Sequence, residues 1–401
     1  MVEERDSSCL LSELRETFKS GRTRSFEWRK TQLEAMLNML THQEHSCFQA
    51  LDHDLGKTHV ESYKDEAETR LLFYPAKAEV IPEPYGLVLI ITSWNYPLQL
   101  ALEPLIGAIA AGNVVVIKPS EIAPATSSFL SKTIPLYLDS TAIKVIEGGS
   151  DTTQQLLQHQ WDKIFYTGSP RVGKIIMTEA AKHLTPVTLE LGGKCPMIFD
   201  FPSISSDLKI DMLKRTVRRF YGENLETLKG MTRIVNKFHF DRLRGLLKDP
   251  LVANSIVHGG SYDEERLYLK KIVESIEFIN SKPKPLALYA FTNDESLKTR
   301  IVSETSSGSV TFNDVLIHCL CDGLPFGGVG PSGIGRYHGK YSFETFSHEK
   351  AVLRRGFFPD LNARYPPWNT FKLEFCRVGY RFDYIALILL LLGLKSFPKE
   401  S

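Results

Sequence analysis

A glutamate at the end of an alternating apolar segment is the residue of this sequence best placed to do chemistry. Apolar residues alternate with polar ones over 187–191, which is the period-2 pattern of a strand, and Gly192-Gly193 allows a sharp turn directly after it. Open sheets bind ligands at such strand ends. We therefore expect Glu190 to lie half buried beside a cleft, where desolvation would raise its pKa and let it act as a general base near neutral pH. A solvated glutamate at a strand end would show the same local pattern.

Two more segments combine a predicted strand end with polar groups. Asn95 lies between a strand and Pro97, where its side-chain amide could donate a hydrogen bond to a developing oxyanion, although an Asn before a helix is more often a cap. The segment from Gly168 to Gly173 follows a strand and opens a helix, and Pro170 suits the first helical turn, which leaves neighbouring amides to meet an anion. Its GxxxxG spacing differs from the GxGxxG fingerprint, and an ordinary strand-to-helix turn would have the same appearance.

The elements that must position these residues alternate in type between residues 86 and 191. Strands are predicted at 87–92, 114–118, 143–146, 163–167 and 187–191, and helices at 98–111, 123–138, 152–159 and 171–183. This alternation requires crossover connections, so we predict an α/β fold with a parallel, doubly wound sheet and helices on both faces. Residues 10–80 have helical spacing throughout and are expected to form a packing layer.

Five motifs along the chain are informative when they are read together. They are Thr-Ser-Trp-Asn-Tyr-Pro at 92–97, Ile-Lys-Pro-Ser-Glu at 117–121, Phe-Tyr-Thr-Gly-Ser-Pro-Arg-Val-Gly-Lys at 165–174, Glu-Leu-Gly-Gly-Lys at 190–194 and Pro-Phe-Gly-Gly-Val-Gly-Pro-Ser-Gly at 325–333. In this combination the chain resembles the NAD(P)-dependent aldehyde dehydrogenases. The segments 337–343 and 346–348 are typical of the class 3, fatty-aldehyde branch. The resemblance runs from about Leu14 to Pro367 with two interruptions.

The resemblance implies an activity and a role for each site residue. The activity is oxidation of fatty or other hydrophobic aldehydes to carboxylic acids with NAD or NADP, by a chain that is expected to form a homodimer. In that scheme Asn95 stabilises the oxyanion and Glu190 activates water. The residues that would hold the dinucleotide are Lys118, Glu121, Gly168, Ser169 and Gly173. From the residue type alone, Lys118 would be a solvated lysine at a strand end.

The resemblance fails at the nucleophile. Aldehyde oxidation by this mechanism needs a thiolate that attacks the carbonyl carbon. The family keeps that cysteine in a Gly-Gln-x-Cys segment a few dozen residues after Glu-Leu-Gly-Gly-Lys, whereas the interval 205–224 contains no cysteine here, and none occurs between Cys195 and Cys319. The Glu-x-Phe-Gly-Pro motif, which holds the nicotinamide ribose in the family, is also absent, because 269–280 runs directly into 281–286. We therefore expect a truncated second domain.

Three other thiols are candidates to replace the missing one. Cys195 follows Glu190 by five residues and is expected to be a small buried hydrophobe. Cys319 and Cys321 precede the glycine-rich segment 324–330, although no neighbour in the sequence would lower their thiol pKa. Two further hypotheses stay open, namely a catalytically silent relative that binds nucleotide or pairs with an intact subunit, and a truncated chain that does not fold stably.

Composition excludes some partners and suggests a compartment. With 48 basic and 47 acidic residues mixed along 401 positions, the chain has no large positive electrostatic potential that would attract nucleic acid. Six cysteines without zinc-like pairing predict free thiols, a reducing compartment and no metal site. The acidic, polar start over residues 1–6 argues against a secretory signal and for a cytoplasmic protein.

The segment from Tyr384 to Leu394 has eleven residues without a charge, between Asp383 and Lys395. A spanning helix needs about 20 apolar residues, so we expect an interfacial or membrane-anchoring tail, with association to a membrane such as the endoplasmic reticulum, in preference to a buried core helix. The predicted organisation is a helical layer (1–80), an NAD(P)-binding domain (81–191), a truncated α/β catalytic domain (192–345), a carboxyl-terminal arm (346–380) and the tail (381–401).

Overall fold

A computed structural model describes most of the chain. The described residues are 25–55, 76–200, 206–221, 279–357, 369–380 and 383–394, with 17, 20–22, 235–239, 241, 245, 362 and 365–367. Much of the helical layer predicted for residues 10–80 lies outside these ranges, including 10–16 and 56–75. The point of the second omission, between residues 280 and 281, lies inside them. By its contacts the chain divides into two units, Met1–Ile81 with Ala351–Ser401, and Pro82–Lys350, and each is described by itself.

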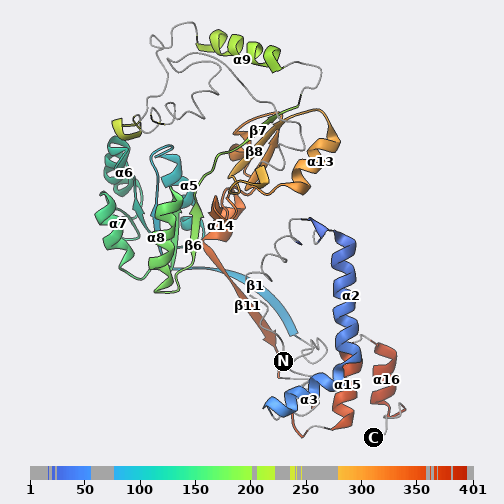
Figure 1. The fold of residues 1–401 in the computed structure, drawn as a ribbon. Helices are drawn as coiled ribbons and strands as arrows, with labels where there is room; N and C mark the ends of the chain where they lie inside the picture. Colours follow the sequence, from blue (N-terminus) through green and yellow to red (C-terminus); the bar gives the residue numbers. More distant parts are fainter. Residues whose placement is uncertain are drawn as a thin grey trace, which may run out of the picture. The chain divides into compact units, whose positions relative to one another are not determined.

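A six-stranded sheet forms the centre of the unit Pro82–Lys350 (Figure 1). Its strand order is β10 (Gly333–Ile334), β6 (Val187–Glu190), β5 (Lys163–Thr167), β2 (Leu87–Ile91), β3 (Val114–Lys118) and β4 (Ile143–Val145). Neighbouring strands are parallel, except that β10 runs antiparallel to β6. The chain adds β3 and β4 on one side of β2 and then β5 and β6 on the other, which confirms the doubly wound sheet.

Helices cover both faces of this sheet because alternate residues of its strands point in opposite directions. Val88 and Ile90 share an apolar cluster with residues of α5 (Gln99–Ala110) and α6 (Pro124–Tyr137). Leu89 and Ile91 belong to a second cluster, with residues of α7 (Ser150–Leu157) and α8 (Pro170–Ala181). Burial on both faces explains why the strands appear in the sequence as continuous apolar runs.

A second, three-stranded sheet lies in the same unit. It consists of β7 (Met197–Phe199), β8 (Ala287–Phe291) and β9 (Ser309–Phe312), all parallel, with α13 (Glu295–Glu304) as the crossover between β8 and β9. Its apolar cluster contains Ile198, Leu288 and Ile301. This part of the chain therefore forms an α/β layer despite the missing segments. The amphipathic helix α9 (Ser206–Tyr221) follows β7 in the chain.

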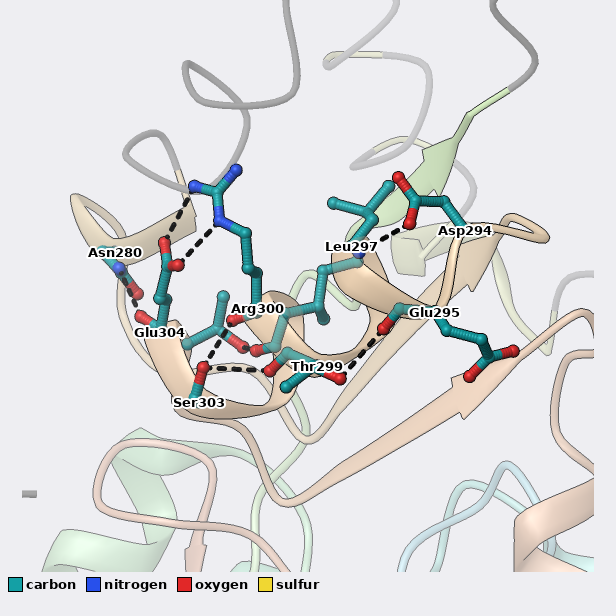
Figure 2. Close-up of polar contacts among 10 residues, drawn as sticks. Asn280, Asp294, Glu295, Leu297, Thr299, Arg300, Ser303 and Glu304 are labelled. Atoms are coloured by element: carbon teal, nitrogen blue, oxygen red, sulfur yellow. Dashed lines mark hydrogen bonds and ion pairs between the residues drawn. The ribbon is translucent and has the colours of Figure 1, made fainter. Parts of the chain in front are cut away.

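Polar contacts fix both ends of α13 (Figure 2). The Asp294 side chain accepts hydrogen bonds from two backbone amides of the first turn, at 2.8 and 3.2 Å. Arg300 donates to both carboxylate oxygens of Glu304, at 2.8 and 3.1 Å, and the Asn280 amide donates to the Glu304 carbonyl at 2.8 Å. An amino-terminal cap and an i,i+4 pair thus stabilise the helix that leads into β9.

A long two-stranded ribbon pairs β1 (Ala76–Pro84) with β11 (Ser347–Arg355). The prediction of helix through residue 80 is therefore wrong for 76–80. These residues are mostly exposed and carry charges, and Arg354 and Lys77 both form ion pairs with Glu79, at 3.3 and 3.0 Å. The partner strand lies about 270 residues away in the sequence, so local periodicity gives no sign of the pairing.

The other unit contains α2 (Phe26–His42), α3 (Glu44–Leu55), α15 (Thr370–Tyr380) and α16 (Tyr384–Leu391). The predicted amino-terminal helices are confirmed, yet large apolar side chains of α2 such as Leu33 and Met36 stay exposed. Asp383 caps α16 by accepting from the Ala386 amide at 2.9 Å. Within the described ranges, no helix has both the length and the apolar content that crossing a membrane requires. The boundaries between the five predicted segments stay predictions.

Candidate active site

Buried polar atoms without partners gather at the carboxyl ends of β2, β5 and β6. The strand order reverses at β2, and open sheets bind ligands where such a reversal occurs. Thr92 follows β2 directly, and Thr167 ends β5 in register with Glu190 on β6. The hydroxyls of both threonines and both carboxylate oxygens of Glu190 are buried, and among the described residues they have no hydrogen-bond partner. Because buried polar groups are normally satisfied, this edge fits a ligand or water that supplies the missing bonds.

Glu190 lies where the sequence predicts it, but it is buried more deeply. Its exposed fraction is 4%, and burial raises the pKa of its carboxyl well above the ordinary value. The prediction of half burial is wrong because β10 covers the far side of β6, with Gly333 paired to Glu190. A Cβ on Gly333 would lie 2.4 Å from the Leu189 carbonyl oxygen, so only glycine allows this close approach.

Asn95 lies in the exposed loop between β2 and α5. It is not a helix cap, because the N-cap position of α5 is Leu98, which makes no side-chain cap. The Oδ1 atom of Asn95 accepts a hydrogen bond from the Ser93 hydroxyl at 2.5 Å. This contact leaves the NH2 group of the side chain with no partner in the described part of the chain, so the group is available to donate to a substrate oxygen.

Lys118 ends β3, and it is buried with an exposed fraction of 3%, so the expectation of a solvated lysine is wrong. Its ammonium donates to the Glu121 carboxylate at 2.7 Å. Burial raises the pKa of Glu121, but the hydrogen bonds and charge, chiefly those of Lys118, outweigh that effect and lower the pKa overall. The pair presents a fixed cation and anion beside the end of β2.

The loop from Gly168 to Gly173 forms the start of α8, with Pro170 as the first helical residue. Ser169 is the N-cap, and its hydroxyl accepts from the Val172 amide at 3.4 Å, so one amide of the first turn already has a partner. The Gly168 amide donates to the Glu190 carbonyl at 2.9 Å. A Cβ on Gly173 would lie 2.8 Å from the Leu191 side chain, which shows that this glycine lets the helix pack against the strand.

A dinucleotide fits these residues. Hydroxyls without partners, a buried lysine and a helix amino terminus all follow adjacent strands, and such groups bind ribose hydroxyls and phosphates. The structure brings every predicted cofactor-binding residue to the same edge of the sheet, since each lies at or just after the carboxyl end of β3 or β5.

Sequence reasoning assigned no role to an aromatic and ionic cluster next to this edge. Tyr337 and His338 are buried, and the His338 Nε2 atom lies 3.0 Å from a carboxylate oxygen of Glu103. Tyr337 meets Phe165 edge to face at 5.1 Å between ring centroids and forms an isolated bridge with Phe326. Burial raises the pKa of Tyr337, and the charges of Glu190 and Glu103 add to the effect. The only signal in the sequence was the Tyr-His pair at the start of 337–343.

The structure describes the side chains of four cysteines, Cys195, Cys319, Cys321 and Cys376, and all four are free thiols, as predicted. Cys195 is half buried with a positive φ of 37°, so it is less enclosed than the predicted buried hydrophobe. Cys319 is half buried in the short 3₁₀ helix η4 (Ile317–Leu320), and Cys321 is exposed.

Comparison with known proteins gives consistent matches. The model of the aldehyde dehydrogenase family matches residues 4–224 and 267–352. Aldehyde dehydrogenase family 3 member F1 of Arabidopsis thaliana is 52% identical, over 96% of this chain and 98% of its own. The dimeric NADP-preferring aldehyde dehydrogenase of Rattus norvegicus is 38% identical, over 88% of this chain and 96% of its own. A substrate-bound structure of AldH from Staphylococcus aureus is 34% identical, with a TM-score of 0.69, and covers 94% of this chain and 99% of its own.

The alignment with the Arabidopsis protein runs over 472 positions, whereas this chain has 401 residues. The relative therefore contains segments that have no counterpart here. This difference agrees with the omissions inferred from the sequence, including the one that removes the usual nucleophile.

Proposed function

The chain belongs to the aldehyde dehydrogenase family, and from this premise we propose that it oxidises hydrophobic aldehydes to carboxylic acids at the edge formed by β2, β5 and β6. The family chemistry is that of an oxidoreductase that acts on aldehydes with NAD or NADP. The observation that carries the site assignment is the buried Glu190 carboxylate, which has no partner among the described residues and a raised pKa.

Each site residue has a chemical role in this proposal. Glu190 takes a proton from the water that attacks the acyl carbon, and its raised pKa makes the carboxylate a better base than an ordinary glutamate. The Asn95 amide donates to the oxyanion. NAD(P)+, when bound, would supply the hydride acceptor for the aldehyde carbon. Lys118 and Glu121 would hold its adenosine ribose, and the loop 168–173, with Gly168, Ser169 and Gly173, would face its phosphates.

We also propose that the tail contacts a membrane and that the chain forms a homodimer. The apolar side chains of α16 support the first point, because Ile385 and Ile388 are 75% and 56% exposed. Replacing both with Glu should release the protein from phosphatidylcholine vesicles in a flotation assay. The rat relative that is named dimeric supports the second point, which light scattering would test.

The test of the activity is the rise in NADH or NADPH absorbance when the purified chain receives a medium-chain aldehyde and NAD+ or NADP+. Turnover with either dinucleotide is expected. If protein that is folded and binds dinucleotide gives no rise, the activity is refuted, and the chain is a silent relative.

A further inference from the structure

A thiol, an imidazole and a hydroxyl form a chain of contacts just after β9. The Cys319 Sγ atom lies 3.7 Å from the Nε2 atom of His318, within hydrogen-bond distance for sulfur. The other ring nitrogen of His318, Nδ1, lies 3.1 Å from the Thr311 hydroxyl oxygen. A nucleophile that contacts a base, which is in turn oriented by a third group, is the usual arrangement for nucleophilic catalysis.

The surroundings of His318 suit it to accept a proton. Its ring stacks on Phe326 and lies near Tyr289, both at 5.9 Å between centroids. Burial lowers the pKa of His318, and the neighbouring His338 adds to the effect, so the imidazole is neutral at neutral pH. With Nδ1–H donated to the Thr311 hydroxyl, Nε2 has the lone pair that faces the thiol.

The same thiol lies beside the aromatic cluster that adjoins the candidate site. Phe326, which stacks on His318, is bridged to Tyr337, and the strand β10 between them pairs with Glu190. The carboxylate form of Glu190 and the thiolate form of Cys319 would each raise the pKa of Tyr337. Cys319 and Glu190 therefore flank the same aromatic cluster.

We propose that Cys319 is the nucleophile of this chain, with His318 as its general base and Thr311 as the residue that orients the base. The assignment rests on the proposed aldehyde oxidation and names the residue that replaces the missing cysteine. Cys195 and Cys321 are weaker candidates, because the described part of the chain offers neither of them an imidazole contact.

The proposed reaction balances with the residues at hand. The thiol proton of Cys319 moves to His318 Nε2 as the Sγ–C bond forms at the aldehyde carbon, and the carbonyl π electrons move to the oxygen, where Asn95 stabilises the negative charge. With NAD(P)+ as the acceptor of the hydride from the same carbon, the carbonyl would form again as a thioester. Water then attacks the thioester and loses a proton to Glu190. The S–C bond breaks, and the sulfur recovers its proton from His318 as the carboxylic acid leaves.

This arrangement predicts a thiol that is protonated at rest. Burial raises the pKa of Cys319, and the nearby Glu103 and Cys195 add to the effect. Iodoacetamide should therefore alkylate Cys319 slowly at neutral pH and faster as the pH rises, whereas the base in the site removes the proton only during attack.

The experiment measures acylation and oxidation separately. The full-length protein is treated with a p-nitrophenyl ester without dinucleotide, and the acylated cysteine is located by peptide mass spectrometry. In parallel, NAD(P)H formation from a medium-chain aldehyde is followed for the wild type, Cys319→Ser and the matched control Cys321→Ser. We expect acylation on Cys319, oxidation reduced to background in Cys319→Ser, and wild-type rates in Cys321→Ser.

His318→Gln separates a base from a structural contact. It should lower kcat by about 10²- to 10⁴-fold. It should also remove the acidic limb of the kcat/KM profile, which arises because protonated His318 cannot accept the thiol proton. Acylation at another cysteine, or full oxidation in Cys319→Ser, would overturn the nucleophile and leave the proposed function intact. Acylated Cys319 in a wild type that forms no NAD(P)H would support the nucleophile and refute the proposed function. Locating the acylated cysteine in the wild type identifies the nucleophile even if a variant fails to fold.

Discussion

Replacing Glu190 with glutamine should separate dinucleotide binding from turnover. The two side chains have nearly the same shape, and the described residues offer no hydrogen bond to either carboxylate oxygen, so the substitution breaks no internal contact there. It removes only the ability to take a proton from water. Loss of a general base usually lowers the rate about 10²- to 10⁴-fold, which corresponds to about 2.7 to 5.4 kcal/mol in the activation free energy. The dissociation constant for the dinucleotide should stay within about twofold of the wild-type value.

The same substitution has a consequence for stability that depends on pH. The unfolded chain ionises Glu190 near the ordinary glutamate pKa of 4.5, whereas burial raises the folded pKa well above it. Between these values the folded state keeps a proton that the unfolded state has released. The stability from this group is therefore complete below pH 4.5 and is lost as the pH rises through the folded pKa. Glutamine avoids the loss, so above the folded pKa the variant should be more stable by about 1.4 kcal/mol for each pH unit that separates the folded pKa from the unfolded one.

The assay pairs steady-state NAD(P)H formation with fluorescence titration of the dinucleotide and urea unfolding at acidic and alkaline pH. Glu179→Gln is the control, because this glutamate lies on α8 and forms a surface ion pair with Lys182 at 2.7 Å. Unchanged turnover in Glu190→Gln would refute the assignment of the base. A variant that is no more stable than the wild type at alkaline pH would refute the argument about its buried charge.

Three other substitutions test the surroundings of the site. Lys118→Met should weaken dinucleotide binding about tenfold or more with little change in kcat, because it removes a buried, charged hydrogen-bond donor. If calorimetric titration gives the variant and the wild type the same affinity for the dinucleotide, this role of Lys118 is contradicted. His338→Ala should lower the free energy of unfolding, measured with urea, by about 2 to 4 kcal/mol, because it opens a cavity and leaves Glu103 without its histidine partner. A decrease of less than about 1 kcal/mol would show that this pair contributes little to stability. Gly333→Ala should lower the melting temperature by several degrees more than Gly330→Ala, because both glycines have positive φ but only at Gly333 would an added Cβ lie within 3 Å of a backbone atom. Equal effects would argue against the close packing of β10.

The central sheet could be predicted accurately from the sequence. Predicted strands and helices between residues 86 and 191 differ from the observed ones by at most two residues at either end. This accuracy has a physical reason, because strands buried on both faces must be continuously apolar and the helices between them must be amphipathic. The ribbon of β1 and β11 was not predicted, because its exposed, charged residues lack the alternation of apolar and polar residues that indicates a strand.

By itself the sequence determined the family, the doubly wound sheet, the position of Glu190 at a strand end and the absence of the usual cysteine. Each of these depends on residue type and near-neighbour spacing, which a linear chain displays directly. Only the tertiary structure decided how deeply Glu190 is buried, that Lys118 is buried with Glu121 as its partner, and which thiol has a base beside it. Those properties depend on β10, which covers β6 from 143 residues along the chain, and on the turn after β9, which brings His318 back to Thr311. Contacts between distant segments leave no period in the sequence, so they exist only once the chain has folded.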